Sequence, residues 1–302
     1  QRFIANPADA DVLARMVATG AKPTADLLDG MARLAFDDSL DPAFRALALR
    51  LPSDDDMAAT LHAAGHVPDP MRIHKARRSL GLALAETLAP GLEQLEQSCR
   101  VEGAFSAEAI PAGKRALRLA ALSFQTRLDE GKAAKAAFVQ SYNMTESFGA
   151  LSILLENGYG EQELAAFSSK WAGDRLVMDK WFTLQAGSRR QDVLRTVTAL
   201  MEHPAFALTN PNKVRALIGA FGRNLAAFHA ADGSGYRFMA DQVLAIDAIN
   251  PQVASRLVSC FNRRSRVEPA RAELMRVELA RVLAHDGLSR DVYEIVSKNL
   301  NA

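Results

Sequence analysis

Five prolines share one setting in this chain, and that setting restricts the fold more than any other feature. Each follows a polar residue and opens a stretch in which apolar residues recur every three or four positions. Proline at the first helical position loses no hydrogen bond, and Asp or Asn before it can accept from the amides of the first turn. The pairs predict five helix starts: Asp41-Pro42, Asp69-Pro70, Asn210-Pro211, Asn250-Pro251 and Glu268-Pro269.

Most of the other segments also have a helical period. Apolar residues follow that period from about residue 24 to 36, and residues 114–128 form an amphipathic stretch with a basic face. Ser53 is a suitable cap for the acidic turn that follows it, and Asn143 and Glu146 have the spacing of a capping box. Alternating β-branched runs are almost absent. The sequence therefore predicts an all-α fold.

The helix starts at Pro211 and Pro251 lie 40 residues apart, with a further helical stretch over residues 236–249 between them. One helix pair per roughly 40 residues is the period of HEAT and armadillo repeats. In such folds each pair buries its apolar stripe against its neighbours. No linker or low-complexity tract divides the chain. We therefore predict an α-solenoid, a superhelix of HEAT/armadillo-like helix pairs, forming a single domain over residues 1–302.

Composition excludes several classes of partner. The chain has 36 Lys+Arg and 35 Asp+Glu, so its net charge is +1. This balance does not indicate a basic surface that binds nucleic acid. No apolar run of about 18 residues occurs, so we expect no membrane span. Cys99 and Cys260 offer no disulfide framework, which favours a reducing compartment. Because the chain begins at Gln1 without a methionine, we expect a piece of a longer polypeptide.

A search for catalytic groups finds none that match a known arrangement. His62 and His66 have the spacing of two zinc ligands on one helical face, but the glutamate of H-E-x-x-H is missing between them. Ser234 does not lie in a G-x-S-x-G elbow. His229 and Asp232 could meet across a turn, where a local hydrogen bond is favoured over a catalytic pair. We therefore expect no catalytic residue, metal or cofactor in this chain.

The stretch that follows Asn250 carries the candidate site. Val253, Leu257 and Phe261 recur at i, i+4 and i+8, which predicts a core-facing helical face. Gln252 and Arg256, also four residues apart, project together from the other face. Taken by itself, such a polar pair favours a solvated surface.

Three segments carry a family resemblance. Residues 250–257 (Asn-Pro-Gln-Val-Ala-Ser-Arg-Leu), 210–221 and 228–236 resemble the C-terminal domain of the bacterial aminopeptidase N group, part of the M1 family of zinc aminopeptidases. Further similar segments occur in the same order through nearly the whole chain, at residues 40–53, 142–145 and 176–182. The resemblance therefore covers almost the entire sequence.

The resemblance implies a part without chemistry of its own. In this family the zinc, the general base and the glutamates that hold the substrate's amine belong to an upstream catalytic domain. That domain, a β-saddle and a β-sandwich are expected to be absent from this chain. The C-terminal helical domain closes over the catalytic domain and limits access to peptides. The implied partners are the upstream catalytic domain and peptide substrates, and the implied location is cytoplasmic.

The resemblance also assigns substrate-binding roles to three residues. Gln252 resembles a glutamine at the edge of the first side-chain pocket, and Arg256 and Arg215 resemble arginines that face the chamber. A guanidinium donates in planar geometry to peptide carbonyls and carboxylates, which suits such a position. The resemblance is less close for Arg215, because residues 222–225 are one residue shorter than the family pattern, and a surface ion pair or an interdomain contact stays an alternative for this residue. For the whole chain the alternative is a free-standing α-solenoid that binds peptides or proteins on its concave face.

Overall fold

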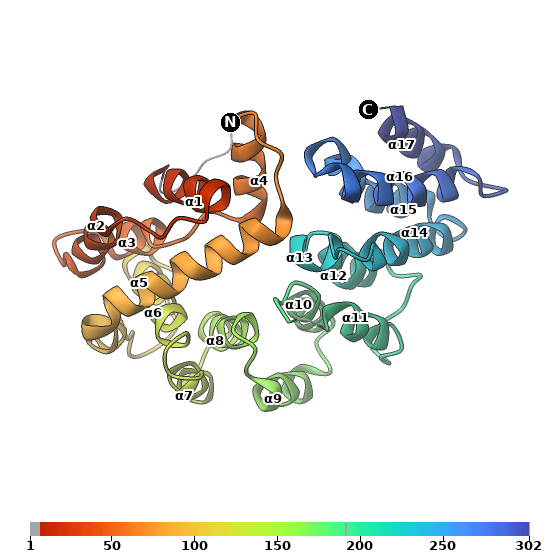
Figure 1. The fold of residues 1–302 in the computed structure, drawn as a ribbon. Helices are drawn as coiled ribbons and strands as arrows, with labels where there is room; N and C mark the ends of the chain where they lie inside the picture. Colours follow the sequence, from red (N-terminus) through yellow and green to blue (C-terminus); the bar gives the residue numbers. More distant parts are fainter. Residues whose placement is uncertain (1–6, 191, 302) are drawn as a thin grey trace. The chain divides into compact units, whose positions relative to one another are not determined.

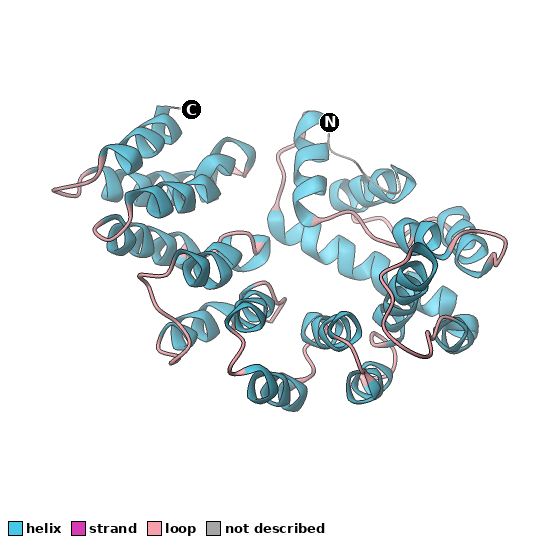
Figure 2. Ribbon diagram, turned by 180° about the vertical axis from the view of Figure 1, so that it is seen from behind, coloured by secondary structure: helices cyan, strands magenta, loops and turns pink. Residues whose placement is uncertain are grey.

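The computed structural model describes residues 7–190 and 192–301, and within those ranges every regular element is a helix (Figure 2). The all-α prediction is confirmed. By their contacts these residues form two compact units, one with the described residues up to 64 and 71–164, the other with residues 65–70 and the described residues from 165 on. The prediction of a single domain over residues 1–302 stays a prediction.

The helices are labelled in chain order (Figure 1). Those that start before residue 160 are α1 (Pro7–Thr19), α2 (Ala25–Phe36), α3 (Pro42–Ala48), α4 (Asp54–Ala63), α5 (Pro70–Ser98), α6 (Ala109–Gln125), α7 (Lys132–Gln140) and α8 (Met144–Glu156). The later α-helices are α9 (Glu161–Trp171), α10 (Arg175–Ala186), α11 (Val193–Met201), α12 (Pro211–Phe221), α13 (Leu225–Phe228), α14 (Ser234–Asp247), α15 (Pro251–Val258), α16 (Pro269–Leu283) and α17 (Arg290–Asn301). A 3₁₀ segment, η1 (Ser259–Arg266), follows α15.

All five proline-defined helix starts are confirmed: α3, α5, α12, α15 and α16 begin at the predicted prolines. Asp41 accepts hydrogen bonds from the amides of Ala43 and Phe44. Asn250 accepts from the amide of Val253. These bonds satisfy donors that a helix start otherwise leaves without partners, so the starts are encoded locally.

The predicted cap at Ser53 and the predicted capping-box pair Asn143 and Glu146 both stand at helix starts, and the reciprocal backbone bond of a full capping box is present at Ser53. The Ser53 hydroxyl accepts from the amide of Asp56, whose carboxylate accepts from the Ser53 amide, at the start of α4. At α8 the Asn143 side chain accepts from the amide of Glu146 at 3.0 Å. The Glu146 carboxylate is itself buried, which ties this cap to the interior of the first unit.

The first unit has a predominantly apolar core with one charged network. Helix α5 runs through it, burying Leu80, Leu84 and Leu88 completely. Arg118 of α6 donates to Glu96 of α5 at 2.7 Å and to Glu146 of α8 at 2.5 Å. Arg118 belongs to the basic face predicted over residues 114–128, and the packing of three helices encloses its guanidinium.

In the second unit neighbouring helices pack in pairs, including α10 with α12, α14 with α15, and α15 with α17. An aromatic cluster lies inside it, where the ring of Phe228 meets those of Tyr236 and Phe261 edge-on at 5.0 and 5.5 Å. The predicted core position of Phe261 is confirmed, although the α-helix ends before this residue and the 3₁₀ segment η1 contains it.

His229 belongs to the same cluster, and its partner differs from the predicted one. The ring Nδ1 forms a 2.6 Å hydrogen bond with the hydroxyl of Tyr236. Asp232 instead accepts from the amide and hydroxyl of Ser234, within its own turn. The predicted bond between His229 and Asp232 is wrong because the imidazole turns inward while the carboxylate stays at the surface.

Candidate functional site

Helices α12 and α15 bring two of the three predicted site residues to one place. Arg215 and Arg256 line a common hollow in the second unit, with a volume of about 350 Å³. They are 41 positions apart in the sequence, and α14 connects their helices: it packs against α15, and its Phe238 ring lies 5.1 Å from that of Phe221 in α12. The structure thus juxtaposes them, while their role in binding stays a prediction.

Two further arginines, Arg223 and Arg263, line the same hollow. We call the cavity bounded by Arg215, Arg223, Arg256 and Arg263 the arginine hollow. No Asp or Glu is among the described residues that line it. Its remaining surface is largely apolar and includes the side chains of Met239, Val253 and Leu257. The arginine hollow therefore combines a cationic wall with an apolar floor.

The contacts of Arg215 are local and neutral. Its Nε donates to the carbonyl of Pro211 at 3.1 Å, and its Nη2 donates to the side-chain oxygen of Asn212 at 2.6 Å. Within the part of the chain that the structure describes, it has no carboxylate partner. The ion-pair alternative for Arg215 therefore finds no support among the described contacts.

Gln252 lies on α15 one turn before Arg256, and its side chain is exposed. It is not part of the lining of the arginine hollow. Val253 was predicted to face the core, but it is only half-buried and lines the hollow, while Ala254, Leu257 and Val258 are buried. The core face of α15 is thus rotated slightly from the predicted one.

Cys260 also lines the hollow, but its thiol is not activated as a nucleophile. Burial raises the pKa of its thiol far above the usual value, with nearby Arg263 acting weakly in the opposite sense. A thiol held protonated is a poor nucleophile. The hollow therefore presents donors for an anion and lacks an activated nucleophile at this position.

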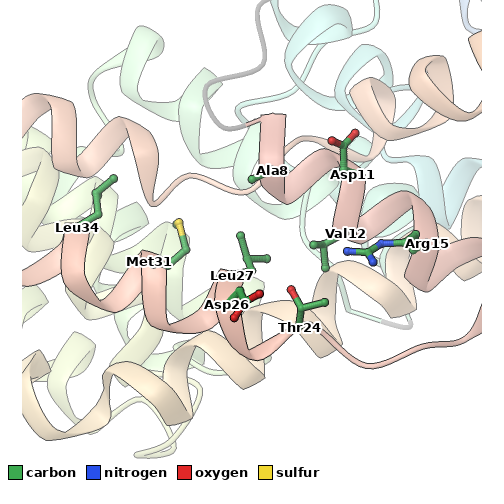
Figure 3. A pocket seen from close by; sticks show the side chains of 10 residues that line it. Ala8, Asp11, Val12, Arg15, Thr24, Asp26, Leu27, Met31 and Leu34 are labelled. Atoms are coloured by element: carbon green, nitrogen blue, oxygen red, sulfur yellow. The ribbon is translucent and has the colours of Figure 1, made fainter.

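A second cavity, of about 470 Å³, lies between α1 and α2 in the first unit (Figure 3). Val12, Leu27 and Met31 form an apolar surface, and Asp11 and Arg15 add opposite charges. No predicted site residue lies there. This cavity lacks the convergence of like charges that marks the arginine hollow.

The possible zinc ligands do not form a site. Helix α4 ends at Ala63, so His66 lies beyond it, and both His62 and His66 are exposed. Over residues 7–190 and 192–301 there is no group of three His, Cys, Asp or Glu side chains placed to hold a metal ion. Among the described helices, none combines the length and apolar character needed to cross a membrane.

Comparisons with known proteins place this chain in a family. The family described as "Domain of unknown function (DUF3458_C) ARM repeats" matches residues 7–301, which confirms the helical-repeat fold class. Aminopeptidase N of Caulobacter vibrioides is 40% identical over 278 residues, covering 90% of this chain and 32% of that protein. Aminopeptidase N of Escherichia coli is 37% identical over 279 residues, covering 90% of this chain and 31% of that protein.

A solved structure of an aminopeptidase is also similar to this chain. The crystal structure of Legionella pneumophila aminopeptidase A in complex with aspartic acid superposes with a TM-score of 0.88 at 27% identity, covering 98% of this chain and 36% of that one. This chain therefore spans about a third of the length of the curated relatives it matches. The resemblance to the helical domain of aminopeptidase N is confirmed, and the chain belongs to the DUF3458_C family of ARM-repeat domains.

Proposed function

We propose that this chain is the C-terminal, chamber-forming domain of a zinc-dependent aminopeptidase that removes N-terminal residues from peptides. It encloses the active-site cavity, lines the substrate channel and contributes no catalytic residue of its own. The observation that carries the proposal is the placement of Arg215 and Arg256 in one hollow. The chain that holds them is similar to a segment that makes up about a third of the length of Caulobacter aminopeptidase N. Gln252, exposed one turn from Arg256, completes the substrate-facing set.

The chemistry of the arginine hollow supports this role. A peptide brings carbonyl oxygens and a terminal carboxylate, and a guanidinium donates to both through a planar fork. The Legionella relative was crystallised with aspartic acid, an amino acid of the kind that an aminopeptidase releases. Positioning by such donors lowers the barrier of a reaction carried out by other groups.

Zinc does not fit the described residues of this chain. A catalytic zinc takes three protein ligands and keeps one open position. His62 and His66 are exposed at the end of α4, and no third ligand joins them among the described residues. In the proposed enzyme the metal is therefore held outside this chain, and this chain acts by enclosing and orienting the peptide.

The experiment that tests the proposal replaces the matching third of Caulobacter vibrioides aminopeptidase N with this chain. The chimera is expected to hydrolyse a chromogenic alanyl amide and a tripeptide, while this chain alone does neither and holds no stoichiometric zinc after dialysis. The unmodified relative is the positive control. Turnover by this chain alone contradicts the proposal, as does a folded, zinc-loaded chimera that processes no peptide, the result expected for a free-standing scaffold.

A further inference from the structure

A third cavity lies inside the first unit, and its lining differs from that of the arginine hollow. It has a volume of about 450 Å³ and is lined by residues of α5, α6 and α8 and by residues between 46 and 53. Charged side chains of both signs line it: Arg50, Arg77, Arg127 and Glu156. We call it the mixed-charge cavity. Its volume suits a small molecule.

Two of these arginines are held in place by the protein. Nη1 of Arg77 donates to Oδ1 of Asp54 at 2.9 Å, and both side chains are mostly buried. Arg127 is half-buried, and a Cβ atom at Gly81 would stand 3.1 Å from its Cζ. Because Gly81 has no side chain, the guanidinium of Arg127 can lie against the backbone of α5. A donor that is already in place loses little conformational entropy when a ligand binds.

The other two charged residues, Arg50 and Glu156, lie at the opening of the cavity, because both are exposed and both line it. Neither side chain has a hydrogen bond or an ion pair within residues 7–190 and 192–301. Both groups are therefore available to a ligand. A guanidinium and a carboxylate at one opening attract a molecule that carries both charges, because each of its charges meets an opposite one.

Most of the remaining lining of the mixed-charge cavity is apolar. Leu49, Phe124 and Ile153 are buried and line it. Leu119 lines it too, and a Cβ atom at Gly149 would come within 2.6 Å of its Cδ1. The glycine therefore lets the side chain of Leu119 lie close to the backbone of α8. An apolar surface of this kind gains stability when a hydrocarbon side chain covers it.

The three kinds of surface narrow the class of ligand. An inorganic anion meets the carboxylate of Glu156 as well as the arginines, and it leaves the apolar surface uncovered. A purely apolar molecule leaves the charged groups at the opening without partners. A zwitterion with an apolar side chain matches all three surfaces. Its carboxylate accepts from a guanidinium, its ammonium donates to Glu156, and its side chain covers the apolar lining.

We propose that the mixed-charge cavity binds a zwitterion that has an α-ammonium, a carboxylate and an apolar side chain. Glu156 receives the ammonium, and Arg50 and Arg127 receive the carboxylate. A free amino acid and a short peptide share this chemistry, and the ligands used in the test distinguish them. Only the source of the ligand rests on the proposed function, since an aminopeptidase releases free amino acids. The binding itself does not depend on hydrolysis.

The test measures binding to this chain by isothermal titration calorimetry. The ligands are leucine and leucyl-leucine, each also as its N-acetyl derivative, which has no ammonium, and as its amide, which has no carboxylate. At least one of the two zwitterions is expected to bind about tenfold more tightly than both of its derivatives, because each derivative loses one charge-assisted hydrogen bond. The zwitterion that binds identifies the source of the ligand.

Two variants connect each charge of the ligand to its residue. Glu156→Gln is expected to weaken binding of the zwitterion about tenfold and to leave binding of the N-acetyl derivative unchanged. Arg50→Gln is expected to weaken binding of the zwitterion about tenfold and to leave binding of the amide unchanged. Glu86→Gln and Arg78→Gln are the matched controls, because both residues are exposed on α5 and do not line the cavity. All four positions are exposed, so the fold is expected to persist, and circular dichroism checks this.

Three results would contradict this assignment. The first is that neither zwitterion binds more tightly than its derivatives, and the second is that the control variants lose as much affinity as Glu156→Gln and Arg50→Gln. The third is that inorganic phosphate binds as tightly as the zwitterion, which would mean an unspecific anion site. Failure of the proposed function gives a different pattern, in which a zwitterion binds this chain as expected but the Caulobacter chimera hydrolyses no peptide. The two proposals can therefore fail separately.

Discussion

His229 illustrates how a single residue can be placed wrongly from sequence and still have a clear role. It is fully buried, it faces Tyr236, and its backbone carbonyl accepts from Nε of Arg271 at 2.7 Å. Burial, with smaller contributions from Arg263 and Arg271, lowers the pKa of the imidazole to about 3. The sequence pointed to Asp232 because only chain neighbours are visible at that stage, and the direction of a side chain is set by packing.

The lowered pKa of His229 predicts a pH-dependent stability. Between pH 6.5 and 3 the unfolded chain takes up a proton at this imidazole before the folded chain does, so the free energy of unfolding falls as the pH falls. From pH 7 to pH 5 the loss from this group is about 2 kcal/mol. Urea titrations at both values should show that His229→Gln loses less stability than the wild type.

Asp9 provides an internal check on that measurement. Burial raises the pKa of its carboxyl to about 7, so stability from this group is present at low pH and is lost as the pH rises toward 7. This effect has the opposite sign, but it is the same in wild type and variant. It therefore cancels in the difference between them, and identical pH profiles would contradict the burial of His229.

Arg118 and Arg256 predict opposite results for the same substitution. Arg118 is buried between Glu96 and Glu146, so Arg118→Ala removes the cation from Glu146 and leaves Glu96 only the longer contact with Arg100, and it is expected to cost about 3–5 kcal/mol. Arg256 is exposed, and Arg256→Ala should change stability by no more than about 0.5 kcal/mol. Thermal and urea unfolding of both variants measures this. Similar losses in both would contradict the assigned burial.

At the scale of the single helix, the sequence predicted where helices start better than it predicted how they continue. The proline-defined starts and the Ser53 and Asn143 caps depend on contacts within three residues, so local sequence determines them. Helix α6 begins at Ala109, five residues before the predicted stretch, after Glu108, whose side chain makes no capping bond. The change from α15 to η1 had no sequence signal, since Phe261 keeps its helical spacing.

Two caps provide a matched prediction for these local interactions. Asp41 accepts two amide hydrogen bonds at the start of α3, whereas Thr24 caps α2 without a side-chain bond. Asp41→Ala is therefore expected to lower the free energy of unfolding by about 1 kcal/mol, and Thr24→Ala by clearly less. Chemical denaturation of the two variants in parallel measures the difference. Equal losses would mean that the cap bonds do not stabilise α3.

At the scale of the whole molecule, the fold class followed from sequence period, but the site did so only in part. Arg215 and Arg256 were assigned by resemblance, since nothing local distinguishes them from solvated arginines. Arg223 and Arg263 were missed, although a signal existed. Each follows a predicted arginine by seven or eight residues, about two helical turns, so it returns to a similar face. Which faces meet depends on how α12, α14 and α15 stack, and that is a tertiary property.

We propose that the exposed arginine and glutamine of α15 face peptide substrate in an aminopeptidase. Measuring kcat/KM of the Caulobacter chimera for tripeptides and single-residue amides tests this placement. Arg256→Ala is expected to lower kcat/KM roughly 13- to 160-fold, with the larger loss on tripeptides, because a charge-assisted hydrogen bond is lost. Gln252→Ala should lower it roughly 2- to 13-fold, depending on the first side chain of the substrate.

Arg266→Ala is the control for that measurement, because it removes the same charge from an exposed position outside the arginine hollow. We expect unchanged kcat/KM for this variant and the losses above for Arg256→Ala and Gln252→Ala. Unchanged kcat/KM in all three variants, on tripeptides and amides alike, would mean that neither side chain of α15 faces substrate and that this helix has a solvated polar face.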